Sequence, residues 1–314
     1  MTKPKNIENS IEKIEESTHV NTESTTVVGE EKIITETTLF AEPIHHFKNF
    51  TITNALFTSW IAVLIIIIIS IIVRKKIREV PGKVQGTFEM IIEGGLSLCD
   101  QVTNSRALSI RIFPIAISAF FFILINNWLG LMPLGGFGLV ERVHDSLVFI
   151  PFIRGGTADI NTTLGLSIMA VIGANMFGVF SIGLWKTFNK YVNLKILGQI
   201  GKKIIKEPTI ILVAPVTFFV GLIEIIGEFA KIASLSFRLF GNIFAGEVLL
   251  ASIAALVGYI IPIPFLFLEI LVGFIQALIF SILLTVYFTI AASDHDEHEE
   301  HSETHKDETK VVPA

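Results

Sequence analysis

Five long apolar runs constrain the fold of this chain more than any other feature. They cover residues 52–73, 110–132, 164–185, 210–261 and 262–292. A helix needs about 20 predominantly apolar residues to cross a bilayer, and each run is that long. Hydrophobic side chains make up 51% of the 314 residues, which is more apolar material than a soluble core needs. We therefore predict an all-α polytopic membrane protein with about five crossings.

Two polar ends flank this membrane domain, which we place at 49–292. Residues 1–48 and 293–314 hold most of the acidic excess behind the net charge of −5, and we expect both ends to be disordered. The second end is a tail with four histidines that could bind a metal adventitiously. An acidic low-complexity tail lacks the apolar residues for a rigid site, so a solvated tail is the preferred interpretation. The histidines are His295, His298, His301 and His305.

The sequence argues against a secretory signal and against several kinds of site. The first 48 residues contain no apolar segment of the kind found in a cleavable secretory signal, so the first helix would itself direct insertion. The single cysteine, Cys99, excludes an internal disulfide framework and a multi-thiolate metal site. We expect no cofactor, no metal site and no nucleic-acid partner.

Basic residues predict the orientation. Lysine and arginine cluster after the first and third runs, whereas the loop at 134–162 carries only Arg142 and Arg154. Loops rich in lysine and arginine stay in the cytoplasm. We therefore expect the N-terminus outside and the C-terminus in the cytoplasm, in a bacterial plasma membrane.

Two further segments have distinctive patterns. Residues 81–106 mix apolar and charged side chains, which predicts a helix lying at the cytoplasmic interface without spanning. The segment 208–292 predicts a helix hairpin whose first helix is unusually long. About 45 residues would reach nearly 70 Å, far more than the roughly 30 Å hydrocarbon layer, so that helix must be tilted, curved or broken.

Arg238 places a charge inside the fourth apolar run. Its guanidinium stays protonated, and a charge near the bilayer centre costs roughly 2.5 to 3.5 kcal/mol. No acidic residue lies within four positions, so we expect its partner on another chain. A helical wheel places Glu247 about 180° away from Arg238. The polar residues within about 40° of Arg238 on the same wheel are Glu224, Lys231, Ser234 and Asn242.

The last apolar run carries a second polar stripe with Glu269, Gln276 and Tyr287, which we expect to face the first. Intramembrane carboxylates such as those of Glu224, Glu247 and Glu269 would relay protons or line water-filled half-cavities. The alternative is that Glu224 or Glu228 only neutralises Lys231.

The outer loop ends in Arg154, Asp159 and Asn161, directly before the third helix. Capping of that helix by Asp159 or Thr162 would explain these residues. An entrance for ions is the alternative. Asn126 and Asn127 in the second helix are compatible with interhelical hydrogen bonds or with a role in the ion path.

Several motifs together resemble subunit a of F-type ATP synthases, the membrane stator beside a rotating c-ring. The signature is SLSFRLFGNIFAGE at 234–247, preceded by GLIEIIGEFAKIAS and followed by LEILVGFIQALIFSILLTVYFTIAA. VPGKVQGTFE and TADINTT also have counterparts, and the resemblance covers 43–292. It implies a c-ring, peripheral-stalk b subunits and other ATP synthase subunits as partners, in contact with membrane lipid.

The resemblance also implies a mechanism. Protons would enter an outer half-channel, protonate a ring carboxylate, travel with the ring and leave by an inner half-channel. Arg238 would stand between the two, and Glu224 would belong to the inner one. The residues implied for the outer half-channel are Asp159, Asn242, Glu247, Glu269 and Gln276. The chain lacks a GxxxxGK[ST] loop, so nucleotide chemistry would lie on other subunits and this chain would have no catalytic site of its own.

One position departs from part of the family. Some members carry a histidine paired with a glutamate where this chain has Glu247 and Glu269, and two nearby carboxylates would share a proton. We expect Glu247→Gln and Glu269→Gln each to slow pumping. The rival interpretations are an ion-coupled secondary transporter, which usually shows inverted repeats, and a structural scaffold in which Arg238 tolerates replacement.

Overall fold

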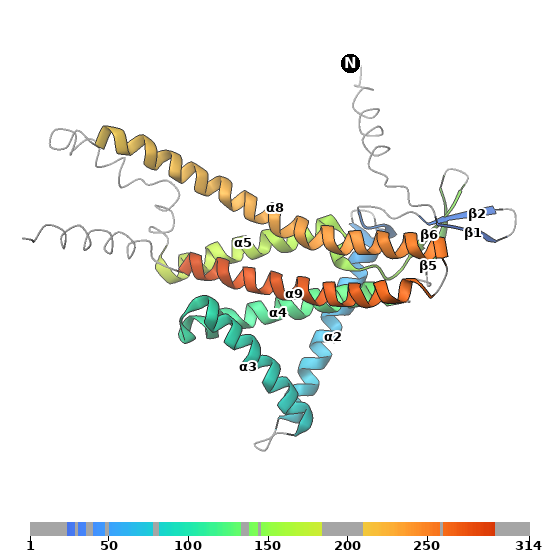
Figure 1. The fold of residues 1–314 in the computed structure, drawn as a ribbon, viewed down its shortest axis with the longest axis horizontal. Coiled ribbons are helices and arrows are strands. Elements are labelled where there is room, and N and C mark those ends of the chain that lie inside the picture. The colour runs from blue at the N-terminus through green and yellow to red at the C-terminus, as the bar shows by residue number, and fades with distance from the viewer. Residues whose placement is uncertain are drawn as a thin grey trace, which may run out of the picture.

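Helices dominate the part of the chain that the structure describes. The computed structural model describes residues 24–28, 31–35, 40–47, 50–77, 82–132, 138–143, 146–183, 210–257 and 260–292. Five helices there are long and apolar enough to cross a membrane, which confirms the predicted all-α membrane architecture. The helices are α2 (Asn54–Lys76), α3 (Lys83–Thr103), α4 (Arg106–Leu131), α5 (Ile160–Ile182), α8 (Ile210–Val257) and α9 (Pro262–Ala292), shown in Figure 1.

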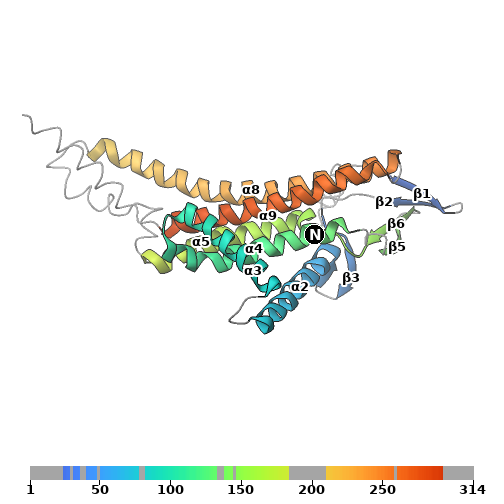
Figure 2. The same cartoon turned by 60° about the horizontal axis from the view of Figure 1, so that its bottom comes forward.

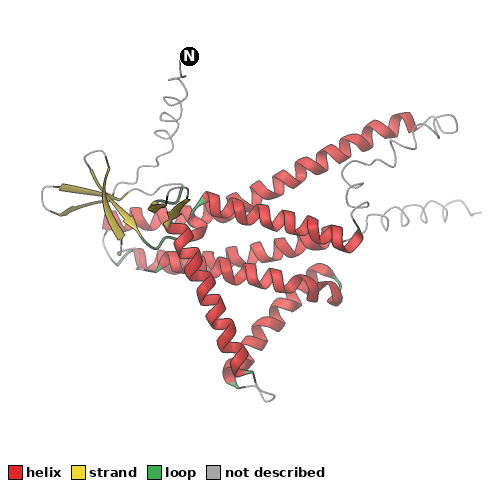
Figure 3. Cartoon of the chain, turned by 180° about the vertical axis from the view of Figure 1, so that it is seen from behind, coloured by secondary structure: helices red, strands yellow, loops and turns green. Residues whose placement is uncertain are grey.

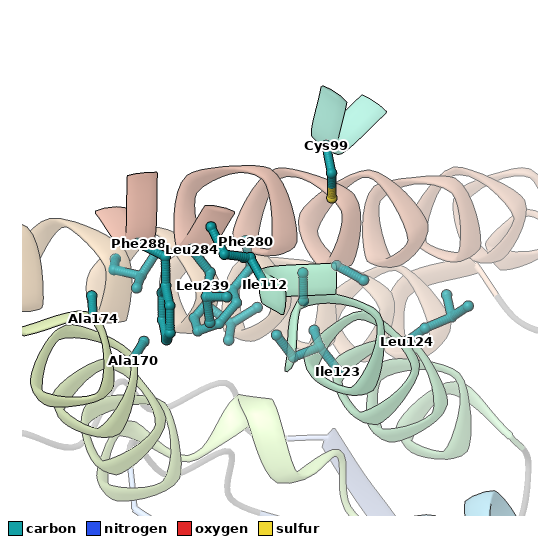
Figure 4. Close-up of a cluster of buried hydrophobic side chains, with 13 residues drawn as sticks. Cys99, Ile112, Ile123, Leu124, Ala170, Ala174, Leu239, Phe280, Leu284 and Phe288 are labelled. Atoms are coloured by element: carbon teal, nitrogen blue, oxygen red, sulfur yellow. The ribbon is translucent and has the colours of Figure 1, made fainter. Parts of the chain in front are cut away.

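The last helix, α9, is the centre of the bundle. It contacts α3, α4, α5 and α8, whereas α2 packs on α4. A buried apolar cluster joins these helices: Ile112 comes from α4, Leu239 from α8, and Phe280 and Leu284 from α9 (Figure 4). Helix association inside a bilayer depends on such close van der Waals contact, because lipid tails are as apolar as the side chains.

The helix α3 has 21 residues but is not among the helices apolar enough to cross a membrane. Together with α2 it forms a V that projects from the bundle (Figure 1). Its C-terminal half docks on α9, where the Cys99 Sγ lies 3.8 Å from the Thr285 Oγ1. Apolar side chains earlier in α3, such as Met90, are exposed. This distribution matches the predicted interfacial, non-spanning helix.

The helix α8 forms the first arm of the predicted hairpin. It is one continuous helix of 48 residues, which corresponds to about 72 Å. Figure 2 shows that it curves and extends past the ends of α5 and α9. The predicted long helix is confirmed, and it is curved rather than broken.

Short strands lie beyond one end of the helices (Figure 3). One sheet has the order β1-β2-β6-β5, and β3 pairs with β4 in a second. Parallel pairing of β2 with β6 sets Ile33 opposite Leu147. Strands β1 to β3 thus lie within 1–48, where we expected disorder. The histidine tail at 293–314 lies outside the described residues. The strands are β1 (Ser24–Val28), β2 (Glu31–Thr35), β3 (Pro43–Phe47), β4 (Phe50–Thr53), β5 (Gly138–Val143) and β6 (Ser146–Pro151).

Candidate functional site

Arg238 lies on an exposed face of α8. Ser234 and Asn242, one turn before and after it, are exposed on the same face, and the Arg238 Nη2 is 3.5 Å from the Ser234 Oγ. Phe237 beside it is 61% exposed. Among the described residues no carboxylate pairs with Arg238. A permanent charge on an apolar outer surface therefore has no counter-ion within the described part of this chain.

Lys231 occupies the other end of the same stripe and is neutralised. Its Nζ donates to the Glu228 Oε1 at 2.7 Å and lies 5.6 Å from the centre of the Tyr287 ring. The Asn175 Nδ2 donates to the Glu228 Oε2 at 3.2 Å. Of the two pairings considered from sequence, the structure forms the one with Glu228. Glu224, one turn earlier, is half-buried.

Glu247 points away from Arg238 and binds a different arginine. The Arg154 Nε donates to both carboxylate oxygens of Glu247, at 3.1 and 3.3 Å, and its Nη2 donates to Oε2 at 3.2 Å. The Arg154 side chain is only 4% exposed. This pair of a buried arginine and a half-buried glutamate joins the loop before α5 to α8, and our sequence interpretation did not identify it.

Glu269 lies against α8 near Glu247. Its carboxylate fills the space beside Gly246, where any added Cβ would overlap it. Glu269 is buried, and its Oε1 accepts no hydrogen bond from the described residues. Glu247, Glu269 and Asn127 line one cavity of about 180 Å³, which has room for several water molecules.

The two polar stripes face each other only in part. Glu269 meets α8 at Gly246, and Gln276 is buried on the same face of α9. Lys231 of the first stripe also lies over the Tyr287 ring of the second, whereas the part of the stripe around Arg238 is exposed. The helix α9 therefore faces the side of α8 between Arg238 and Glu247.

Asp159 caps α5, as one of the sequence interpretations expected. Its carboxylate accepts from the backbone N–H groups of Asn161 and Thr162, at 3.3 and 3.2 Å. It also accepts from the Ala41 N–H at 3.2 Å, which ties the segment before β3 to the start of α5. A hydrogen bond of 3.3 Å between the Thr163 and Ser236 hydroxyls then joins α5 to α8.

Asn126 and Asn127 form interhelical contacts. The Asn127 Nδ2 donates to the Gly273 carbonyl of α9 at 3.0 Å, and its Oδ1 accepts from the Thr157 hydroxyl. Asn126 accepts from the Ser59 hydroxyl of α2 at 3.2 Å. Both asparagines thus fix helices around the cavity. No cluster of three or more potential metal ligands is present among the described residues.

Comparison with known proteins agrees with this architecture. The family model described as ATP synthase A chain matches residues 56–289. The ATP synthase subunit a of Geotalea daltonii is 30% identical over 74% of this chain and 85% of its own length. The ATP synthase subunit a of Mycobacterium bovis is 32% identical over 78% of this chain and 89% of its own length. The chain therefore belongs to the ATP synthase subunit a family, the proton-translocating stator subunit of Fo.

Proposed function

We propose that Arg238 separates two half-channels through which protons reach and leave the carboxylates of a c-ring. The observation that carries this proposal is the exposed position of Arg238 without a counter-ion among the described residues. An ionised carboxylate on a rotating ring would be attracted to the guanidinium and would neutralise it. A permanent cation also keeps protons from passing directly between the channels.

The outer half-channel comprises Asp159, Asn242, Glu247, Glu269 and Gln276, and Glu224 belongs to the inner one. The cavity lined by Glu247 and Glu269 supports the outer assignment, because water in it would carry protons toward α8. One elementary charge crossing 100 mV yields about 2.3 kcal/mol, which drives ring rotation.

The remaining assignments concern the assembly. The c-ring docks on the Arg238 face of α8, b subunits bind elsewhere on the chain, and nucleotide chemistry belongs to other subunits of the complex. The membrane domain at 49–292 lies in a bacterial plasma membrane, with the N-terminal extension outside and the tail in the cytoplasm. Family membership does not favour a secondary transporter.

The test is ATP-driven acidification of inverted membrane vesicles that carry wild-type chain, Arg238→Ala or Arg238→Lys. Assembly of each complex is checked first. We expect Arg238→Ala to abolish pumping and Arg238→Lys to be at least tenfold slower, because a lysine can lose its proton when desolvated (about 1.4 kcal/mol per tenfold). Normal pumping by both assembled variants would support the scaffold interpretation instead.

A further inference from the structure

Arg154 is a buried charged residue beside the cavity that Glu247 and Glu269 line, and the half-channel assignment gives it no role. Resting on the proposed function, we propose that Arg154 is a positioning residue: it holds Glu247 as a fixed counter-ion, so that Glu269 alone takes up protons from the outer cavity.

The geometry of the guanidinium supports a fixed role. Nε and Nη2 face Glu247, while Nη1 donates to the Phe40 carbonyl at 3.1 Å. The backbone N–H of Arg154 donates to the Thr58 hydroxyl of α2 at 3.2 Å. Arg154 is thus anchored on several sides, and its side chain is only 4% exposed. A guanidinium held by these partners has little freedom to rotate and release the Glu247 carboxylate.

The two carboxylates at the cavity therefore differ. Both oxygens of Glu247 accept hydrogen bonds from Arg154. Glu269 has no ion pair among the described residues, and its Oε1 accepts no hydrogen bond there. A proton arriving through cavity water would bind the Glu269 carboxylate and then pass to the ring carboxylate. Glu247 stays with Arg154 throughout, so the two glutamates do not share a proton.

A double-mutant cycle tests this division. Initial pumping rates in inverted vesicles, normalised to assembled complex, are compared for Arg154→Gln, Glu247→Gln, Glu269→Gln and the two doubles that contain Arg154→Gln. Glu247→Gln leaves the buried Arg154 without its counter-ion, and Arg154→Gln releases the half-buried Glu247 from its fixed position, so both should slow pumping. We expect Arg154→Gln/Glu247→Gln to pump about tenfold faster than Arg154→Gln alone, since residues in contact typically couple by this much.

Glu269 gives the contrasting arm. The fold-reduction in pumping rate of the Arg154→Gln/Glu269→Gln double should equal the product of the fold-reductions of its two singles. No recovery is expected, because Glu269 carries the proton whether or not the pair exists. Arg154→Lys should keep more activity than Arg154→Gln, since it retains the charge but not the fork. The exposed Arg111 supplies the matched control, and Arg111→Gln should pump at the wild-type rate.

The inference is overturned if the Arg154→Gln/Glu247→Gln double is as slow as its slower single, since Glu247 would then be a carrier. If Arg154→Gln reduces assembly, the cycle is measured on the amount of assembled complex. A double that pumps faster per assembled complex than Arg154→Gln alone then supports the proposed role of Arg154. A double that pumps as slowly as its slower single overturns that role. Arg238→Ala is measured in the same series: pumping by that variant refutes the proposed function, whereas an inactive Arg238→Ala with no recovery in the double refutes only the role of Arg154.

Discussion

Gly246 leaves room beside α8 for the carboxylate of Glu269. A Cβ there would overlap the carboxylate of Glu269, so Gly246→Ala must displace that group. Overpacking of this kind costs about 1 to 3 kcal/mol, and here it also moves a proposed proton carrier. We expect Gly246→Ala to slow ATP-driven pumping by about tenfold while the complex still assembles.

Gly165 on α5 provides a matched control for that change. A Cβ at Gly165 meets nothing within 4 Å, so Gly165→Ala adds the same methyl group in open space. It should pump as wild type does. Equal rates for the two variants would mean that the position of Glu269 does not matter for proton transfer.

At this scale the sequence predicted isolated residues better than it predicted their partners. The charge at Arg238, the separate direction of Glu247 and the cap at Asp159 all follow from helix periodicity and residue chemistry. The Arg154–Glu247 pair joins residues 93 positions apart, and helix periodicity carries no information about such a distance. The available signal was an arginine close to the start of a membrane helix, on the side where basic residues are few.

Close packing between α5 and α9 depends on glycine at one level of the bundle. A Cβ at Gly178 would lie 2.6 Å from the Ala291 carbonyl oxygen, which belongs to backbone and cannot rotate away. Gly178→Ala should therefore push the helices apart and destabilise the subunit by about 1 to 3 kcal/mol. The measurement is thermal aggregation of the detergent-solubilised complex, in which the variant should aggregate at a lower temperature.

Gly173 lies on the same helix and also faces α9. Comparing Gly173→Ala with Gly178→Ala therefore distinguishes the effect of close packing from the effect of helix propensity. A Cβ there meets only the Phe288 ring at 3.5 Å, an ordinary contact. Gly173→Ala should be neutral or stabilising by up to about 1 kcal/mol, since alanine favours the helix over glycine. Equal destabilisation by both variants would contradict the close approach at Gly178.

Helices were predictable from the sequence where a single pattern, such as an apolar run, extends over many residues. The apolar runs located α2, α4, α5, α8 and α9, because about 20 apolar side chains outweigh any local preference. The strands β1 and β2 were missed, although Gly29 separates two short segments rich in threonine, valine and isoleucine, a typical hairpin pattern. Their polar surroundings suggested disorder, and β2 pairs with a strand more than a hundred residues away.

The whole molecule has two unlike ends. At one end the strands, the cap at Asp159 and the Arg154–Glu247 pair lie together. The segment around Ala41 contacts both sites, because the Ala41 N–H donates to Asp159 and the Phe40 carbonyl accepts from Arg154. Figure 1 shows the strands at the end where α8 gives way to α9. The opposite end includes the start of α8 and the last turn of α9. In the proposed mechanism the outer half-channel opens on one side only, so the orientation of these ends would decide which pool of protons reaches Glu269.

The basic loops predict that the strand-bearing end faces outward, and cysteine labelling tests this. The native Cys99 is a weak background, because burial raises the pKa of its thiol and little thiolate forms. With an impermeant maleimide, Ser17→Cys should label in right-side-out vesicles, and Ser302→Cys only in inverted ones. The opposite pattern would place the Glu269 cavity on the cytoplasmic side. Labelling of both positions from one side would require an even number of crossings, against the five that the apolar helices supply.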